Sequence, residues 1–151
     1  MSFNIVLYQP EIPANTGNIG RLCVGTNSIL YIVKPMKFMI TDKYLKRAGL
    51  DYWDKLDVRF YDGWNDFLNI NADRKLLFFT TKSNQVYSRI NFQDGDFLIF
   101  GPETRGIPED ILKKHWESSF TIPMSKQIRS INLSNSVAIV LYEALRQTGF
   151  N

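Results

Sequence analysis

Short apolar runs alternate along this chain with longer stretches of helical periodicity, and no other feature constrains its fold as strongly. Each run has the length of one strand, is rich in β-branched and aromatic residues, and is bounded by turn-forming residues. The predicted strands span residues 3–8, 29–33, 58–61, 76–80, 97–100 and 120–122. The predicted helices span residues 15–26, 62–68, 108–114 and 133–146. This alternation predicts an α/β fold whose mostly parallel sheet, of about six strands, carries helices on both faces.

Several polar side chains stand where helices are expected to begin. Asn15 is a candidate N-cap of the first predicted helix, and Asp62 of the second. Ser130 or Asn132 is the candidate for the last helix, which Gly149 follows as a stop signal. For Asn15, Ser130 and Asn132, capping a helix is the alternative to a role in a functional site.

The length of 151 residues predicts a single domain, residues 1–151, and the composition excludes several kinds of chemistry. One cysteine cannot form an internal disulfide, and one cysteine with one histidine cannot supply a zinc tetrad, so no metal site is expected. His115 lies in a charged stretch and is predicted to be a surface residue. Cys23 lies among small and apolar residues and is predicted to be buried and unreactive.

The chain shows no signal for export or for membrane insertion. Its N-terminus has no basic leader, and no apolar run approaches the roughly 20 residues of a membrane span. We therefore expect a cytoplasmic protein without a membrane partner.

The net charge of +3 is concentrated in one part of the sequence. This basic cluster consists of Lys34, Lys37, Lys43, Lys46 and Arg47. Such a cluster suits a polyanionic partner, and a solvated surface explains it equally well.

Common nucleotide-binding motifs are absent, whereas three polar loops are present. The turn after the first strand lacks G-x-G-x-x-G, and two P-loop-like glycine pairs lack the Lys-Ser/Thr that binds phosphate. The three polar loops, residues 15–21, 101–106 and 122–135, each follow an apolar strand. Ligands bind beyond the carboxyl ends of strands in an open α/β sheet, so these loops are expected to converge on one site.

The three loops resemble the sequence motifs of the SPOUT RNA methyltransferases. Residues 101–106 read Gly-Pro-Glu-Thr-Arg-Gly, and residues 130–136 read Ser-Ile-Asn-Leu-Ser-Asn-Ser. The resemblance extends to residues 8–13, 47–53 and 80–82, and so covers nearly the whole chain. Within the family, the sequence is most similar to the short enzymes that methylate the 2′-hydroxyl of cytidine or uridine 34 in tRNA.

The resemblance implies a fold and a cofactor site. The fold would contain a deep trefoil knot in its C-terminal part, a rare exception to the rule that chains are not knotted. The knotted loops would bind S-adenosylmethionine and release S-adenosylhomocysteine. The residues expected to bind the cofactor are Phe79, Thr80, Gly101, Glu103, Ile122, Met124, Ser130 and Leu133.

The resemblance also implies a substrate and an assembly. The methyl acceptor would be the wobble ribose in the anticodon stem-loop of tRNA, with leucine tRNAs as the expected substrates. Family members of this kind are homodimers whose active sites take groups from both subunits. The last helix and the first motif would supply the dimer interface.

The residues expected to act in catalysis are Arg21, Asn15, Glu103, Ser130 and Asn132. The family gives Arg21 the role of base, but the pKa of an arginine side chain lies far above neutral pH, so a guanidinium normally carries its proton. Our hypothesis is that Arg21 binds a flanking phosphate or polarises the ribose hydroxyl. The other four residues are expected to orient the loops, the ribose and the methionine part of the cofactor.

Two other functions stay open on the sequence. A SPOUT enzyme that acts at another RNA position, or on a base, would share every pocket residue. A non-catalytic RNA-binding module with the same fold is the second alternative, which the intact Arg21, Glu103 and Asn132 disfavour.

Overall fold

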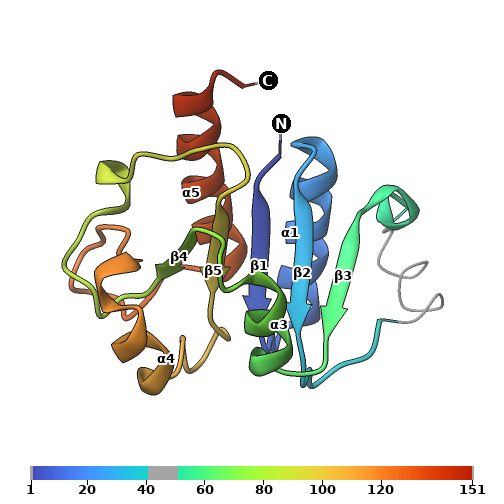
Figure 1. Ribbon diagram of the computed structural model, residues 1–151, viewed down its shortest axis with the longest axis horizontal. Helices are drawn as coiled ribbons and strands as arrows, with labels where there is room; N and C mark the ends of the chain where they lie inside the picture. The colour runs from blue at the N-terminus through green and yellow to red at the C-terminus, as the bar shows by residue number, and fades with distance from the viewer. Residues whose placement is uncertain (1, 41–50, 151) are drawn as a thin grey trace.

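The parallel sheet at the centre of the fold is formed by six strands among residues 2–40 and 51–150, which this computed structural model describes. Their order is β3-β2-β1-β5-β4-β6, and every pairing is parallel (Figure 1). The strands are β1 (Asn4–Tyr8), β2 (Ile29–Val33), β3 (Val58–Tyr61), β4 (Leu76–Phe79), β5 (Phe97–Phe100) and β6 (Ser119–Phe120). The predicted α/β architecture is therefore confirmed.

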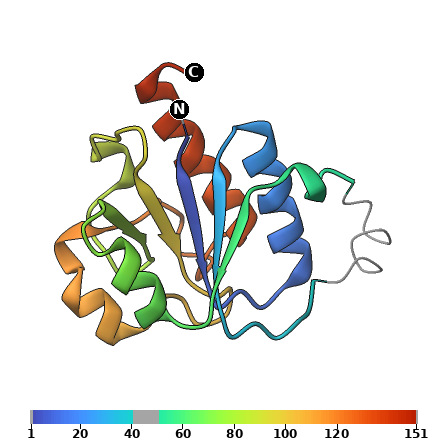
Figure 2. The ribbon, with the colours of Figure 1, turned by 45° about the vertical axis from the view of Figure 1, so that its right-hand side comes forward.

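Helices cover both faces of the sheet. The main helices are α1 (Pro13–Gly25), α3 (Trp64–Asn71), α4 (Glu109–Lys114) and α5 (Leu133–Thr148). Helices α1 and α5 pack against each other on one face, while α3 and α4 lie on the other (Figures 1 and 2). No helix in the described ranges is both long and apolar enough to cross a membrane.

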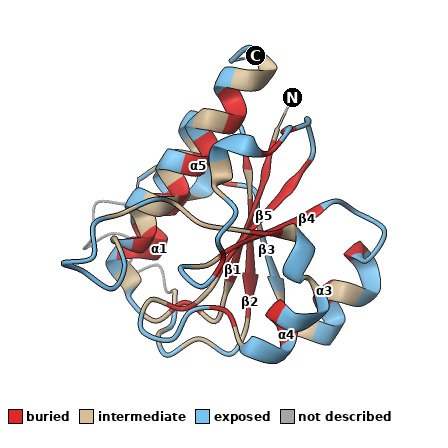
Figure 3. Cartoon of the chain, turned by 90° about the vertical axis from the view of Figure 1, so that its left-hand side faces the viewer, coloured by how far each residue is buried: buried red, intermediate tan, exposed pale blue. Residues whose placement is uncertain are grey.

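Successive strand residues contribute to two hydrophobic cores because side chains alternate between the faces of a strand. In β1, Ile5 and Leu7 belong to the core under α1 and α5, and Val6 belongs to the core under α3 and α4. Figure 3 shows the buried residues concentrated in the strands and on the inner sides of α1 and α5. Cys23 lies in the first core, and its burial raises the pKa of the thiol to about 12, as expected for an unreactive side chain.

The predicted helix ends are partly right. Asn132 caps α5 by accepting a hydrogen bond from the Asn135 backbone amide, and Gly149 ends this helix with a left-handed φ of 95°. The predicted caps Asn15 and Asp62 are wrong. Helix α1 begins earlier, at Pro13, because the fixed φ of proline suits a first helical turn, and α3 begins after Gly63.

The segment that contains β6 lies between β4 on one side and residues 85–87, from the loop after β4, on the other. The Thr80 amide donates to the Phe120 carbonyl at 2.9 Å on one side. On the other side, the Thr121 amide donates to the Gln85 carbonyl at 2.7 Å, and Val86 forms a parallel bridge with Thr121. The predicted strand 120–122 thus corresponds to β6 and this bridge. A segment enclosed in this way is consistent with the α/β knot fold.

Gln147 of α5 holds the loop between β4 and β5 against the helix. Its Oε1 accepts a hydrogen bond from the Phe92 amide at 2.9 Å, and its Nε2 donates to the Ile90 carbonyl at 3.0 Å. The same Nε2 donates to Glu143, whose pKa is lowered to about 2 by hydrogen bonds from Arg146 and from Gln147. One side chain therefore satisfies two backbone groups at buried residues.

We expect Gln147→Ala to lower the free energy of unfolding by about 1–3 kcal/mol, because it leaves two buried backbone groups without partners. Urea unfolding at fixed protein concentration measures the change. The control is Gln127→Ala, which removes an exposed glutamine side chain. Equal unfolding midpoints for the two variants would contradict the anchoring role of Gln147.

Candidate functional site

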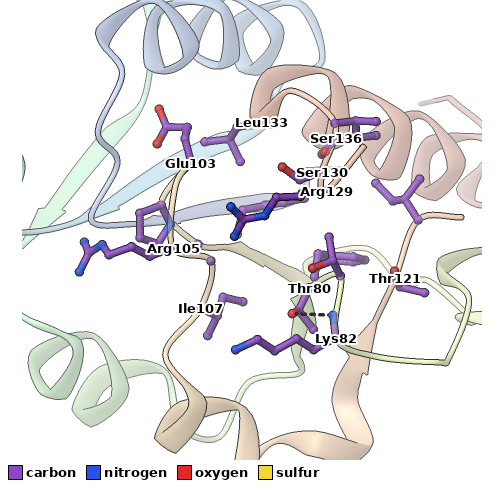
Figure 4. Close-up of a pocket in the computed structure, with 18 of the residues that line it drawn as sticks. Thr80, Lys82, Glu103, Arg105, Ile107, Thr121, Arg129, Ser130, Leu133 and Ser136 are labelled. Carbon is purple, nitrogen blue, oxygen red and sulfur yellow. Dashed lines mark hydrogen bonds between the residues drawn. The ribbon is translucent and has the colours of Figure 1, made fainter. Parts of the chain in front are cut away.

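A cavity of about 420 Å³ opens at the carboxyl ends of β4 and β5 (Figure 4). Its walls come from the segments 79–82, 100–107, 121–124 and 129–136. The volume lies in the usual range for pockets that bind small molecules. The structure brings together at this cavity all eight residues expected to bind a cofactor, which are Phe79, Thr80, Gly101, Glu103, Ile122, Met124, Ser130 and Leu133.

The cavity walls combine apolar side chains with the backbone at strand ends. Phe79 and Phe100 stack with ring centroids 4.9 Å apart, and both line the cavity. Ile122 and Leu133 add aliphatic surface from the two later loops. The hydroxyl groups of Thr80 and Ser130 also line the cavity, so the site offers both hydrogen bonds and apolar contact.

Gly101 allows the loop after β5 to fold back on itself. A Cβ atom at this position would lie 2.3 Å from the Ile107 nitrogen and 2.4 Å from the Gly106 carbonyl carbon, which no side chain tolerates. Gly106 itself has a φ of +69°, and its amide donates to the Pro102 carbonyl at 2.9 Å. The two glycines thus give the loop a shape that residues with a Cβ atom would disrupt.

A chain of hydrogen bonds through three of the predicted catalytic residues joins the loop after β5 to the first turn of α1 and to the start of α5. The prediction that residues 15–21 form a loop at the site is wrong, because they lie within α1 and none of them lines the cavity. The Glu103 carboxylate accepts from the Glu11 amide at 2.9 Å, the Ile12 amide at 2.7 Å and Asn15 Nδ2 at 3.2 Å. Asn15 Oδ1 in turn accepts from Asn132 Nδ2 at 3.0 Å. Asn15 and Asn132 do not line the cavity, so this network positions the loops from behind it.

Glu11 links the turn after β1 to the loop after β5 a second time, a role that was not predicted from the sequence. Its Oε1 accepts hydrogen bonds from the amide and hydroxyl of Thr104, at 2.9 and 2.7 Å. Its Oε2 pairs with Lys37 at 2.9 Å. These hydrogen bonds lower the pKa of Glu11 to about 2, and those from Thr104 have the largest effect. The signal that could have found it is an acidic residue in the turn directly after the first strand.

Arg21 and Ser130, the other predicted catalytic residues, lie in different places. Ser130 lines the cavity. Arg21 is exposed on α1, is not among the lining residues, and forms no ion pair or hydrogen bond within the described part of the chain. A single subunit therefore does not bring Arg21 to the cavity wall.

His115 is half-buried, so the prediction that it is a plain surface residue is wrong. Its ring stacks on Phe78 with centroids 4.6 Å apart, and burial, followed by the charge of Lys114, lowers its pKa. Phe78 belongs to the core under α3 and α4, whereas its neighbour Phe79 lines the cavity. Since His115 is not a lining residue, it is not placed to accept a proton there.

Three basic residues that the sequence analysis did not assign to the site also line the cavity. They are Lys82, Arg105 and Arg129, and they lie around it in Figure 4. Arg129 directly precedes Ser130 in the third loop, and Arg105 belongs to the second loop, so a count of charges within the loops would have found both.

The basic cluster of the sequence is only partly described by the structure. Lys34 lies 5.5 Å from the centroid of the Phe60 ring, and Lys37 pairs with Glu11. Lys43, Lys46 and Arg47 lie outside the described residues, as does part of the similar segment 47–53. Among the described residues, no group of three or more His, Cys, Asp or Glu side chains is arranged to hold a metal ion.

Comparisons with known proteins agree on one family. The SpoU rRNA Methylase family matches residues 2–142. The tRNA (cytidine(34)-2′-O)-methyltransferase of Escherichia coli strain K12 is 49% identical over 148 residues, which cover 97% of this chain and 94% of the relative.

Solved structures show the same similarity. One, described as giving structural insights into the 2-OH methylation of C/U34 on tRNA, has a TM-score of 0.91 and 37% identity, over 99% of this chain and 98% of that chain. The SpoU methyltransferase AviRb from Streptomyces viridochromogenes, in complex with the cofactor AdoMet, has a TM-score of 0.82 and 20% identity, over 96% of this chain and 57% of that chain. At this identity, AviRb shows similarity of fold alone.

We expect Glu11→Gln to lower the free energy of unfolding at pH 7 by about 1 kcal/mol, because charge-assisted hydrogen bonds to Thr104 and Lys37 become neutral. The folded pKa lies below the ordinary value of 4.5, so the carboxylate stabilises fully above that pH and loses its effect as the pH falls toward about 2. The difference between wild type and variant should shrink over this range in urea unfolding.

The matched control is Glu109→Gln, which removes the exposed ion pair with Lys82 and should change stability little. A Glu11→Gln effect that stays constant between pH 5 and pH 2.5 would show that the charge of Glu11 is not what stabilises the loops.

Proposed function

This chain belongs to the SpoU rRNA methylase family, and from that premise we propose that it methylates the 2′-hydroxyl of nucleotide 34, the wobble nucleotide, in tRNA. The observation that carries the proposal is the convergence of the segments after β4, β5 and β6 on one cavity lined by all eight expected cofactor-binding residues. The similarity to relatives that are named for this reaction, over nearly their whole length, supports the choice of substrate. Leucine tRNAs, recognised through the anticodon stem-loop in the cytoplasm, are the proposed substrates.

The cavity fits S-adenosylmethionine in size and in chemistry. It combines the aliphatic surfaces of Ile122 and Leu133 with polar groups of Thr80 and Ser130 and the backbone next to Gly101. When bound, the cofactor would supply a methyl group that is activated by its positively charged sulfonium. An oxygen nucleophile can accept this methyl group at its carbon. The AdoMet complex of AviRb, which shares the fold, supports this assignment.

Positioning supplies most of the catalysis in this proposal. A ribose hydroxyl is a poor nucleophile until it loses its proton, and no histidine lines the described cavity to accept that proton. The hydrogen-bonded network of Glu103, Asn15 and Asn132 holds the loops in place, so that both reactants are held in a reactive orientation. The Arg21 guanidinium binds the flanking phosphate or polarises the hydroxyl.

The position of Arg21 supports a homodimer with shared active sites. Arg21 lies on the exposed side of α1, away from the wall of its own cavity. Helix α5, which packs beside α1, carries the exposed apolar side chains Ile139 and Tyr142. In the proposed dimer, these two helices form the interface, and each subunit supplies Arg21 to the cavity of its partner.

Incubation with labelled S-adenosylmethionine and a leucine tRNA should place the methyl group on the 2′-oxygen of nucleotide 34. Nucleoside digestion and mass spectrometry identify the product. A synthetic anticodon stem-loop with a 2′-deoxynucleotide at position 34 is the matched control, because it lacks only the accepting oxygen. Methyl transfer to the deoxy substrate, to a base or to another position would contradict the proposal.

A mixed dimer tests whether Arg21 acts across the interface. Arg21→Ala removes the guanidinium, and Thr80→Trp fills the cavity at the end of β4. Each variant alone should be inactive, while the heterodimer purified with two different tags should have about half of the wild-type activity, because one of its two sites is intact. If Arg21 serves its own subunit, the heterodimer stays inactive.

A further inference from the structure

The charged groups that line the cavity are not balanced. Among the described lining residues, Glu103 is the one acidic side chain, and Lys82, Arg105 and Arg129 are basic. Both carboxylate oxygens of Glu103 already accept hydrogen bonds from the segment that leads into α1. The acid of the cavity is therefore committed to holding the loops and does not neutralise the basic groups.

Two of the three basic groups have no acidic partner among residues 2–40 and 51–150. Lys82 pairs with Glu109 at 3.2 Å. Arg105 donates only to a neutral group, the Oε1 atom of Gln9, at 3.3 Å. Arg129 forms no ion pair or hydrogen bond with any described residue. The two guanidinium groups thus remain available to a ligand.

Arg105 and Arg129 come from different loops and line the same cavity. Arg105 follows β5, whereas Arg129 precedes α5, and both side chains are exposed. Figure 4 shows both side chains among the residues that line the cavity. Two unpaired positive charges at one opening repel each other and favour an anionic ligand. The planar guanidinium fork matches a phosphate group well.

The cofactor itself is not the ligand that these two arginines suit, because it is not an anion. S-adenosylmethionine carries one carboxylate, one ammonium and one sulfonium, so its net charge is positive. An RNA strand carries one negative phosphate per nucleotide and would present phosphates on either side of a nucleotide that enters the cavity.

We infer that Arg105 and Arg129 form a phosphate-binding rim, which holds the RNA backbone on the two sides of the nucleotide to be methylated. The inference rests on the proposed RNA methyltransferase function and extends it to the groups that seat the substrate. The rim acts on the substrate backbone, so it contributes affinity for RNA without reading its sequence.

The test compares Arg105→Ala and Arg129→Ala with Arg74→Ala, which removes an exposed arginine at the amino end of β4. Affinity for a tRNA anticodon stem-loop is measured over a range of salt concentrations, and affinity for S-adenosylmethionine is measured by calorimetry. Each rim variant should weaken RNA binding about 5- to 10-fold and reduce the slope of log K against log salt by about 1. Cofactor affinity should stay within about twofold of wild type, and Arg74→Ala should resemble wild type in both measurements.

Two results would overturn the rim. Loss of cofactor affinity with an unchanged salt slope would assign the arginines to the cofactor, and wild-type values in both measurements would leave them without a binding role. Arg129→Lys keeps the charge, so it should restore most of the salt slope that Arg129→Ala loses. If the wild-type enzyme methylates another RNA, the same binding measurements are made with that RNA. A failure of the phosphate-binding rim can therefore be distinguished from a failure of the proposal that nucleotide 34 is methylated.

Discussion

The hydrogen bonds of the Glu103 carboxylate hold together the segments that surround the cavity. The carboxylate accepts hydrogen bonds from two backbone amides in the segment that joins β1 to α1 and from one side-chain amide in the first turn of α1. A partly buried carboxylate is tolerated only where such donors replace water, so the loop after β5 and the start of α1 hold each other in place. Asn132 extends the same network to the start of α5, which it also caps. Loops and helix starts are thus set by one connected group of hydrogen bonds.

This use of the acidic side chains determines the electrostatic character of the cavity. Glu103 and Glu11 are both satisfied by groups of the protein itself, and the pKa of Glu11 is lowered to about 2. The basic side chains at the opening are compensated only in part, since Lys82 has an acidic partner and Arg129 has none among the described residues. The polar framework therefore stabilises the loops and leaves positive charge facing the solvent, an arrangement suited to a polyanionic substrate.

Sequence periodicity was sufficient for the sheet and less so for the ends of its elements. All six predicted strands are present, and the four central ones, β2, β1, β5 and β4, are the buried apolar runs that a doubly covered parallel sheet requires. Asn132 was a correct N-cap, whereas Asn15 was not, because Pro13 starts α1 earlier and places Asn15 inside the helix. His115 was misjudged because its stacking on Phe78 depends on packing between α4 and the sheet, which a charged local sequence does not reveal.

The sequence by itself determined the succession of strands and helices along the chain, the polar loops at 101–106 and 122–135 and the residues that would line a cofactor pocket. Only the tertiary structure decided which charged side chains have hydrogen-bond or ion-pair partners within the described part of the protein. Glu103 and the Glu11 amide lie 92 positions apart along the chain, so no local pattern predicts their hydrogen bond. The same holds for the isolation of Arg21 from its own cavity and for the unpaired Arg129 at the opening. Periodicity reports which side of an element is buried, whereas charge compensation depends on which distant segments the packed sheet brings together.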